Sequence, residues 1–401
     1  MEPLLTWIDF TSKDGDRMRR VLDLFQERGT MDELGLGSIR DTLSYALFPG
    51  TSTLQTRLRY VLFIPWIYKG LEAKNVSSAA VAAEARKAQI ELVGPLVKNA
   101  DNGGVFGSRA QGSLDRLPSM AYWVALVRWG LFQSRHSLSW YHSSFRQLSD
   151  VRGDLGATDD PGLKLTRQPA WHPRLPPIPE GFPGVADLAL TRHEAEFLKG
   201  RLEESCQGTL LGWLAREGSD APAESFWDDP DALRAPEPIT QTVELARRFS
   251  LHVEGALLLY NLMLAERLGK FRECSDRIED YRRKLEAWFE KEKCESAFNP
   301  GKLWALMATE GAPVAGLQRD FLEAWSARVM AQSGVSIADD GELRQRLERR
   351  EFQLKGANRA RLTNQARLLS WRGETGVGRM DFRWHRVRKL LADLHRGLGR
   401  I

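Results

Sequence analysis

The sequence predicts a mainly α-helical, multi-lobed protein with a proline-rich connecting arm. Three observations support this prediction: apolar residues recur at helical spacing through most of the chain, residues 48–68 form an apolar stretch, and prolines concentrate within 151–184. The chain has 401 residues, of which 42% are hydrophobic and 27% charged. These values are ordinary for a globular protein that is long enough for two or three domains.

The central stretch, residues 48–68, predicts a buried helix with a polar start. A Pro-Gly turn is followed by three hydroxyl residues of the kind that cap helices, Thr51, Ser52 and Thr53. No side chain in 60–68 is charged, so we expect this part to be buried on all sides. Pro65 should kink or end the helix, because proline lacks one donor of the helical hydrogen-bond ladder.

Spacing and composition divide the chain into four consecutive regions: an N-terminal helical domain built around the central stretch (1–150), a proline-rich arm (151–184), a helical domain (185–341) and a basic helical region (342–401). The arm holds seven of the 18 prolines, between Pro161 and Pro183, which exclude a helix or a central strand. Its apolar residues Trp171, Leu175 and Phe182 favour an arm packed on a neighbouring domain over a free linker.

Helix starts and apolar periodicity predict the individual elements. After a strand or extended segment at 4–10, helices are expected near 12–29, 38–47, 77–98, 118–132, 136–145, 191–206, 240–268, from 275, at 314–330, 342–354, 359–371 and from Asp381 to the end. The helix near 191 begins with a capping box, Thr191 with Glu194.

Charge is distributed unevenly along the chain. Residues 344–401 hold 16 Arg and Lys against 5 Asp and Glu, a net charge of +11, whereas the other 343 residues hold 41 against 48, a net charge of −7. A basic C-terminal block on a mildly acidic body indicates an anionic partner. This block is the clearest functional signal in the sequence.

The last helix is the best candidate for binding that partner. Projected at 100° per residue, its apolar residues cluster on one side, with Trp384 as a core anchor, and basic residues lie opposite. An exposed basic row is what phosphate contacts require, although a solvated charged face is the alternative. The predicted nucleic-acid ligands are Arg359, Arg361, Arg372, Arg383, His385, Arg386, Arg388, Lys389 and Arg396.

The start of the central stretch is a second, smaller candidate anion site, since helix N-termini favour anions. Its residues would be Thr51, Ser52, Thr53, Arg57 and Arg59. The alternative is that a hydroxyl caps its own helix and that the arginines pair with Asp41 or Asp9.

Catalytic motifs are weak. Residues 107–112 resemble the GSRAxG turn of nucleotidyltransferases, but Asp115 has no second carboxylate near it, so a plain loop is the alternative. Three cysteines without a CxxC pair and seven histidines without a ligand pattern predict no metal site and no cofactor. We expect His252 to be a hydrogen-bonded core residue, and His385 and His395 to face an anion or solvent.

Several segments together resemble an uncharacterised bacterial domain-of-unknown-function family: 6–10, 32–35, 38–41, 48–68, 116–119 with Tyr122 and Trp123, and the closing FRWHRVRKLL. Members of such families tend to lie beside helicase and phospholipase-D-like nuclease genes in antiphage defence clusters. The resemblance implies a role in DNA-directed defence and supplies no catalytic residues.

The sequence therefore predicts a non-catalytic nucleic-acid-binding subunit, with DNA as the expected ligand, of a bacterial antiphage defence complex. The expected partners are nucleic acid and other proteins of that complex, such as a helicase or a phospholipase-D-like nuclease. A protein–protein scaffold is the second hypothesis, and a divergent nuclease or nucleotidyltransferase is the third. Cysteine usage and the lack of a secretory or membrane-spanning segment predict a cytoplasmic location.

Overall fold

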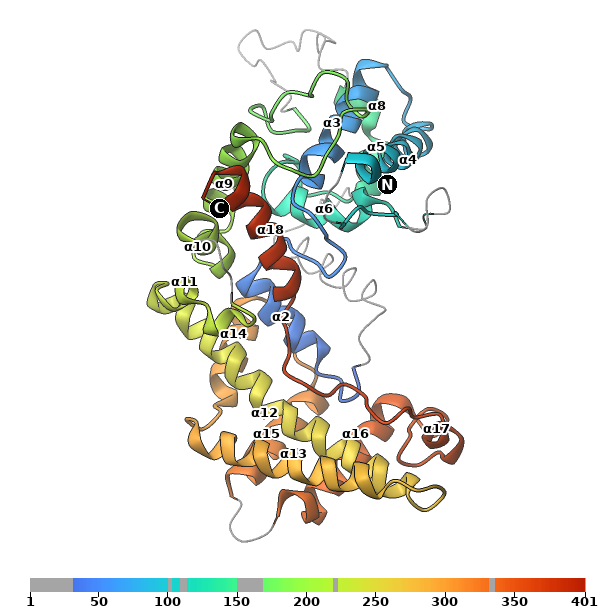
Figure 1. Cartoon of the computed structure of the whole chain (residues 1–401), viewed down its shortest axis with the longest axis vertical. Helices are drawn as coiled ribbons and strands as arrows, with labels where there is room; N and C mark the ends of the chain where they lie inside the picture. Colours follow the sequence, from blue (N-terminus) through green and yellow to red (C-terminus); the bar gives the residue numbers. More distant parts are fainter. Residues whose placement is uncertain are drawn as a thin grey trace, which may run out of the picture. The chain divides into compact units, whose positions relative to one another are not determined.

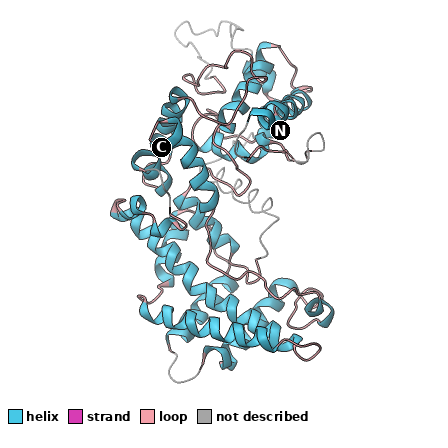
Figure 2. Cartoon of the chain, in the orientation of Figure 1, coloured by secondary structure: helices cyan, strands magenta, loops and turns pink. Residues whose placement is uncertain are grey.

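The computed structural model describes residues 32–99, 103–108, 114, 116–149, 169–218, 223–331 and 336–400. Helices form the framework of this described part, and no β-strand occurs in it (Figure 2). The nearest approach to a sheet is one isolated antiparallel bridge between Phe132 and Trp171. The predicted mainly α fold is therefore confirmed. The elements expected at 4–10 and 12–29 lie outside the described residues.

Two compact units make up the chain (Figure 1). Among the described residues, unit 1 comprises those within 45–240 and 383–400, and unit 2 comprises 32–44 and those within 241–382. The divisions fall inside α2 (Gly37–Leu47) and near the start of α12 (Glu237–Leu268). The division of the chain into four consecutive regions, made from the sequence, remains a prediction.

Unit 1 is organised around α3 (Tyr60–Ala73), as the central stretch predicts. Every residue from 60 to 68 is buried. The surrounding helices are α4 (Val81–Glu91), α5 (Val93–Asn99), α6 (Pro118–Arg128), α7 (Leu138–Ser143), α8 (Phe145–Ser149), α9 (Arg192–Ser205), α10 (Leu210–Glu217), α11 (Pro230–Leu233) and α18 (Trp384–Gly397), with a 3-10 turn, η2 (Phe226–Asp228).

The start of α3 differs from the prediction. The helix begins at Tyr60 rather than after the hydroxyl residues, and Arg59 at its N-cap gives no side-chain cap. The preceding turns are held instead by the Tyr122 hydroxyl, which accepts the N–H groups of Thr56 and Arg57 at 2.7 and 3.0 Å. Pro65 does not end the helix, which continues to Ala73, and the residues around Pro65 from 60 to 68 are all packed in the core.

The described part of the proline-rich arm, 169–184, packs against α3. Trp66 donates its indole N–H to the Pro176 carbonyl at 2.8 Å, and the rings of Phe182 and Phe63 stack at 5.9 Å. Trp171 is buried and donates to the Tyr141 hydroxyl at 3.0 Å. These contacts anchor the described part of the arm on unit 1, as its aromatic content predicts.

Helix α18 closes unit 1 against α9 and α10. The predicted capping box of α9 is present, since Thr191 and Glu194 bond each other's backbone N–H. Trp384 is buried and stacks on Phe48 with centroids 5.7 Å apart. The predicted role of Trp384 as a core anchor is confirmed.

Unit 2 is built on the long helix α12. Its other elements are α13 (Ser275–Cys294), α14 (Pro300–Thr309), α15 (Gly316–Met330), α16 (Gly341–Lys355), α17 (Gln365–Leu369) and the 3-10 turn η3 (Ile337–Asp339). Trp288 of α13 and Trp325 of α15 are buried, and both donate to carbonyls of α12, those of Leu251 and His252. The predicted helices from 240, 275, 314 and 342 are confirmed to within a few residues.

Two predictions about the C-terminal region are wrong. The helix expected over 359–371 is reduced to α17, because Asn364 caps a new helix by accepting the Arg367 N–H and so interrupts the preceding segment. Asp381 does not cap the last helix. Phe382 and Arg383 adopt left-handed backbone with φ of 50° and 71°, and α18 begins only at Trp384.

Candidate nucleic-acid interface

The nine predicted nucleic-acid ligands are distributed over both units. Unit 2 contains Arg359, Arg361 and Arg372. Unit 1 contains the six at the start of and along α18: Arg383, His385, Arg386, Arg388, Lys389 and Arg396. The two sets of residues therefore belong to two separate candidate surfaces, one on each unit.

The outward face of α18 keeps the basic character that the sequence predicts. His385, Lys389 and Arg396 are exposed, and Arg388 is half-buried. In the part of the chain that the structure describes, no carboxylate pairs with Arg388 or Lys389, and Arg396 reaches only 4.0 Å from Asp393. These cations lie on a helix whose opposite face is anchored in the core, so they are held in a row at the surface.

Arg383 and Arg386 have structural contacts. Arg383 is 8% exposed and donates from Nη1 to the Thr51 carbonyl at 2.8 Å. Arg386 is half-buried and donates from Nε to the Thr53 carbonyl at 3.0 Å. Both side chains thereby join the start of α18 to the turns that precede α3. Little of Arg383 remains at the surface for a phosphate.

His395 does not face solvent. The side chain is 2% exposed, and its Nε2 lies 3.1 Å from the Leu214 carbonyl of α10. The expectation for this histidine is wrong because position 395 falls on the side of α18 that packs against α10. His385, by contrast, is exposed as expected.

The residues of the smaller predicted anion site are engaged within the fold. Thr51 donates its hydroxyl to the Phe48 carbonyl at 2.7 Å, and Ser52 donates to the Ala121 carbonyl at 3.3 Å. These residues and Thr53 precede α3 by more than one turn, so they do not form a helix N-terminus. The condition that motivates an anion site here is therefore absent.

Both arginines of that site form ion pairs, as the alternative expects, but with other partners. Arg57 pairs with Asp393 at 2.9 Å, and Arg59 pairs with Glu194 and with Asp187, both at 2.8 Å. Arg57 and Asp393 are separated by more than 300 residues in sequence. Of the two expected partners, Asp41 pairs with its neighbour Arg40, and Asp9 lies outside the described residues. Proximity in sequence does not determine which carboxylate a folded arginine meets.

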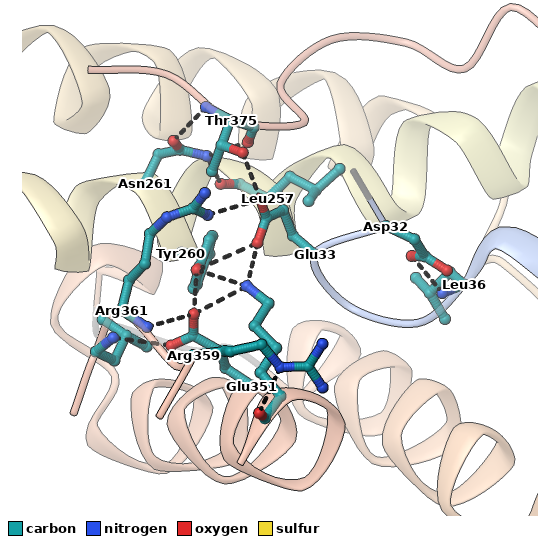
Figure 3. A network of polar contacts seen from close by, with 12 residues as sticks. Asp32, Glu33, Leu36, Leu257, Tyr260, Asn261, Glu351, Arg359, Arg361 and Thr375 are labelled. Carbon is teal, nitrogen blue, oxygen red and sulfur yellow. Dashed lines mark hydrogen bonds and ion pairs between the residues drawn. The ribbon is translucent and has the colours of Figure 1, made fainter. Parts of the chain in front are cut away.

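A buried polar network in unit 2 accounts for Arg361 (Figure 3). Glu33 is 2% exposed and accepts bonds from Lys355, Arg361 and Thr375. Glu351, at 0% side-chain exposure, accepts from Lys355, from Tyr260 and from the N–H groups of Arg361 and Leu362. Two carboxylates thus balance two cations, and the charge of Arg361 is neutralised inside the unit.

The pKa values in this network follow its contacts. Burial raises the pKa of Glu33, but hydrogen bonds from Lys355, Thr375 and Arg361 outweigh it, so the pKa lies below the ordinary value of 4.5. Burial and then the hydrogen bond to Glu351 raise the pKa of Tyr260. Both carboxylates accept hydrogen bonds from the groups around them, as expected of a polar network that stabilises the fold.

Arg359 and Arg372 remain exposed in unit 2. Arg359 donates from Nε to the Lys355 carbonyl at 3.2 Å, which leaves the rest of its guanidinium to solvent. In the described part of the chain Arg372 has no carboxylate partner, and it lines a pocket. Of the nine predicted ligands, the exposed ones are therefore Arg359, Arg372, His385, Lys389 and Arg396, with Arg388 half-buried.

Unit 2 also holds a hydroxyl, an imidazole and a carboxylate in series. His252 lies 2.7 Å from Glu292 through Nδ1 and 2.8 Å from the Ser326 hydroxyl through Nε2. His252 and Ser326 are each 1% exposed, and Ser326 donates to the Leu322 carbonyl of its own helix. Burial lowers the pKa of His252. The expectation of a hydrogen-bonded core histidine is confirmed. Because Ser326 is buried, a substrate cannot reach its hydroxyl.

The described residues contain no group of three His, Cys, Asp or Glu side chains that could hold a metal ion. None of their helices has the length and apolar character needed to cross a bilayer. Most of the GSRAxG segment, 109–112, and Asp115 lie outside the described residues.

Comparison with known proteins identifies the family of the chain. The model of a family of unknown function, DUF6361, matches residues 2–397, so the predicted resemblance to a domain-of-unknown-function family is confirmed. No curated protein and no solved structure matches the chain.

Proposed function

The chain belongs to DUF6361, a family of unknown function, and we propose that it binds nucleic acid through the exposed basic face of α18. The observation that supports this most is the contrast between its cations. Arg57 and Arg59 in the same unit are paired with buried carboxylates, whereas Arg388 and Lys389 have no carboxylate partner among the described residues.

The geometry of α18 suits phosphate contacts. The helix is anchored by Trp384, Val387 and Leu391, all buried, so its outward cations are positioned before a ligand arrives. Preorganised cations lose less side-chain entropy on binding than cations on a mobile tail. Such contacts recognise the backbone and carry no base sequence information. DNA is the ligand that we expect. In this proposal the chain is a non-catalytic subunit of a bacterial antiphage defence complex.

Binding of wild-type protein to labelled double-stranded DNA, single-stranded DNA and RNA across a salt series tests the proposal. Phosphate contacts release counterions, so log affinity should fall linearly with log salt, by about 0.9 per contacted phosphate on B-DNA. Three or four contacts from α18 predict a slope of roughly −3. Absence of binding to all three nucleic acids at low salt would contradict the proposal and favour a scaffold that docks an acidic protein.

The defence role has its own test. Phages should form fewer plaques on bacteria that carry the gene with its neighbours than on bacteria without them. Charge reversal at Arg388 and Lys389 should abolish this protection. Protection that survives this change would separate the defence role from the basic face.

A further inference from the structure

A pocket of unit 2 lies between the start of α13 and the segment that follows α17. Its volume is about 590 Å³, and it is lined by residues 272–277 and 369–372. This volume is in the range typical of sites for small molecules. Three of the lining residues are arginines: Arg272, Arg277 and Arg372.

Two of these arginines are available to a ligand. Within the described residues no carboxylate pairs with Arg277 or Arg372, and both are exposed. Neighbouring arginines on α13 differ, since Arg282 pairs with Glu266 and Asp339, and Arg283 pairs with Asp280. Arg272 donates to the Trp371 carbonyl at 3.2 Å and so joins the two walls of the pocket.

The lining also holds two carboxylates, Glu273 and Asp276. Glu273 accepts the backbone N–H of Ser275 at 2.8 Å and also its hydroxyl. The hydroxyl bond is the main cause of the lowered pKa of Glu273. This carboxylate thus serves the N-terminus of α13, where a negative charge is favoured. Three guanidinium groups against two carboxylates leave the lining positive.

The wall formed by 371–373 is shaped around Arg277. Gly373 has φ of 105°, a backbone conformation that favours glycine, and a Cβ added there would lie 2.7 Å from the Arg277 guanidinium carbon, so the glycine and the guanidinium lie close together. The Gly373 carbonyl accepts the Tyr281 hydroxyl at 2.7 Å. Trp371 in the same wall is 3% exposed, and its indole N–H has no acceptor in the described part of the chain.

We propose that this pocket binds the terminal phosphate of a nucleic-acid strand, with Arg277 and Arg372 bonding the phosphate oxygens. This inference rests on the proposed nucleic-acid function. A terminal monoester carries about −1.5 to −2 charges at neutral pH, against −1 for each internal phosphodiester, so a positive pocket favours the strand end. Leu369, 45% exposed at the rim, offers an apolar contact to the terminal nucleoside.

Fluorescence anisotropy of one short single-stranded DNA with a 5′-phosphate, a 3′-phosphate or hydroxyls at both ends tests the pocket on the full chain. Adenosine monophosphate serves as a competitor without a strand. The test variant is Arg277→Ala with Arg372→Ala. The matched control is Arg283→Ala, because Arg283 is also an exposed arginine of α13 but is already ion-paired.

We expect wild-type protein and the control variant to bind one phosphorylated end about tenfold more tightly than the hydroxyl end, and the double variant to lose this preference. Equal binding of all three strands with steep salt dependence would overturn the pocket and leave the proposed function standing. Binding of the monophosphate but of no strand would overturn the strand-end assignment, and so would the absence of binding by every probe. In both cases the proposed function would still be decided separately, by the double-stranded DNA and RNA arms of its own test.

Discussion

The guanidinium of Arg57 and the carboxylate of Asp393 form a buried ion pair between the turns before α3 and helix α18. Nε lies 3.0 and 2.9 Å from the two carboxylate oxygens, and Nη2 lies 2.9 Å from Oδ1. The same carboxylate accepts the Leu58 N–H at 2.9 Å, and the Asp393 side chain is 4% exposed. The pair therefore positions the helix that carries the proposed interface.

Replacing Arg57 by alanine should destabilise unit 1 without weakening nucleic-acid binding directly. The change leaves the Asp393 carboxylate buried with its arginine removed, which costs about 3 kcal/mol in the free energy of unfolding. Chemical denaturation measures this loss. Arg192→Ala is the control, since the Arg192–Glu196 pair is exposed and should change stability by less than about 0.5 kcal/mol. An unchanged stability with reduced phosphate affinity would instead restore the anion site at 51–59.

Replacing Glu33 by glutamine should destabilise unit 2 at neutral pH and weaken its acid dependence. The folded state lowers the pKa of Glu33 below 4.5, so this group stabilises the fold above its unfolded pKa. That contribution is lost as the pH falls through the lowered folded value. At pH 7 the loss of a buried, ion-paired carboxylate should cost roughly 3 kcal/mol.

The measurement is the difference in unfolding free energy between wild-type protein and Glu33→Gln at pH 7 and at pH 3. The difference should shrink at the lower pH, because protonated Glu33 resembles glutamine. Taking the difference cancels the titration of the other carboxyl groups, which both proteins share. A difference that is the same at both pH values would show that the lowered pKa is not linked to folding.

The described part of the arm should resist proteolysis although it contains no helix. Arg174 is exposed, but it lies between Trp171 and Leu175, which are buried in unit 1. Trypsin should therefore cut after Arg174 slowly in the native protein, and Trp171→Ala should accelerate that cut by releasing the segment. Mass spectrometry of the fragments identifies the site. Rapid cleavage at Arg174 in wild-type protein would show that the arm swings freely.

Local patterns in the sequence predict much of the helical framework. The capping box of Thr191 and Glu194 marks the start of α9, and apolar spacing identifies the buried face of α18. Such signals are short-range, because a cap and a helix face each depend on residues within a few turns. They also explain the wrong prediction of one helix over 359–371. The residues there are basic and favour a helix, so the sequence does not reveal that Asn364 caps a new one.

Long-range pairing could not be predicted from one sequence. Glu33 meets Arg361, and Arg57 meets Asp393, across more than 300 residues in each case. A count of charges treats Arg361, Arg383 and Arg388 alike, whereas the fold uses the first two for internal contacts. The basic block therefore predicts an anionic partner, and only the structure separates structural cations from available ones.

The salt dependence of nucleic-acid binding by the variant Arg388→Glu with Lys389→Glu tests the central claim most directly. Its matched control is Arg192→Glu with Lys199→Glu, which makes the same change in net charge on α9 of the same unit, at two ion-paired residues. If α18 is the interface, the α18 variant loses affinity at low salt, and its log–log salt slope becomes shallower by about 1.8, while the control keeps the wild-type slope. Equal slopes for wild-type protein and the α18 variant, with both folded, would contradict the account.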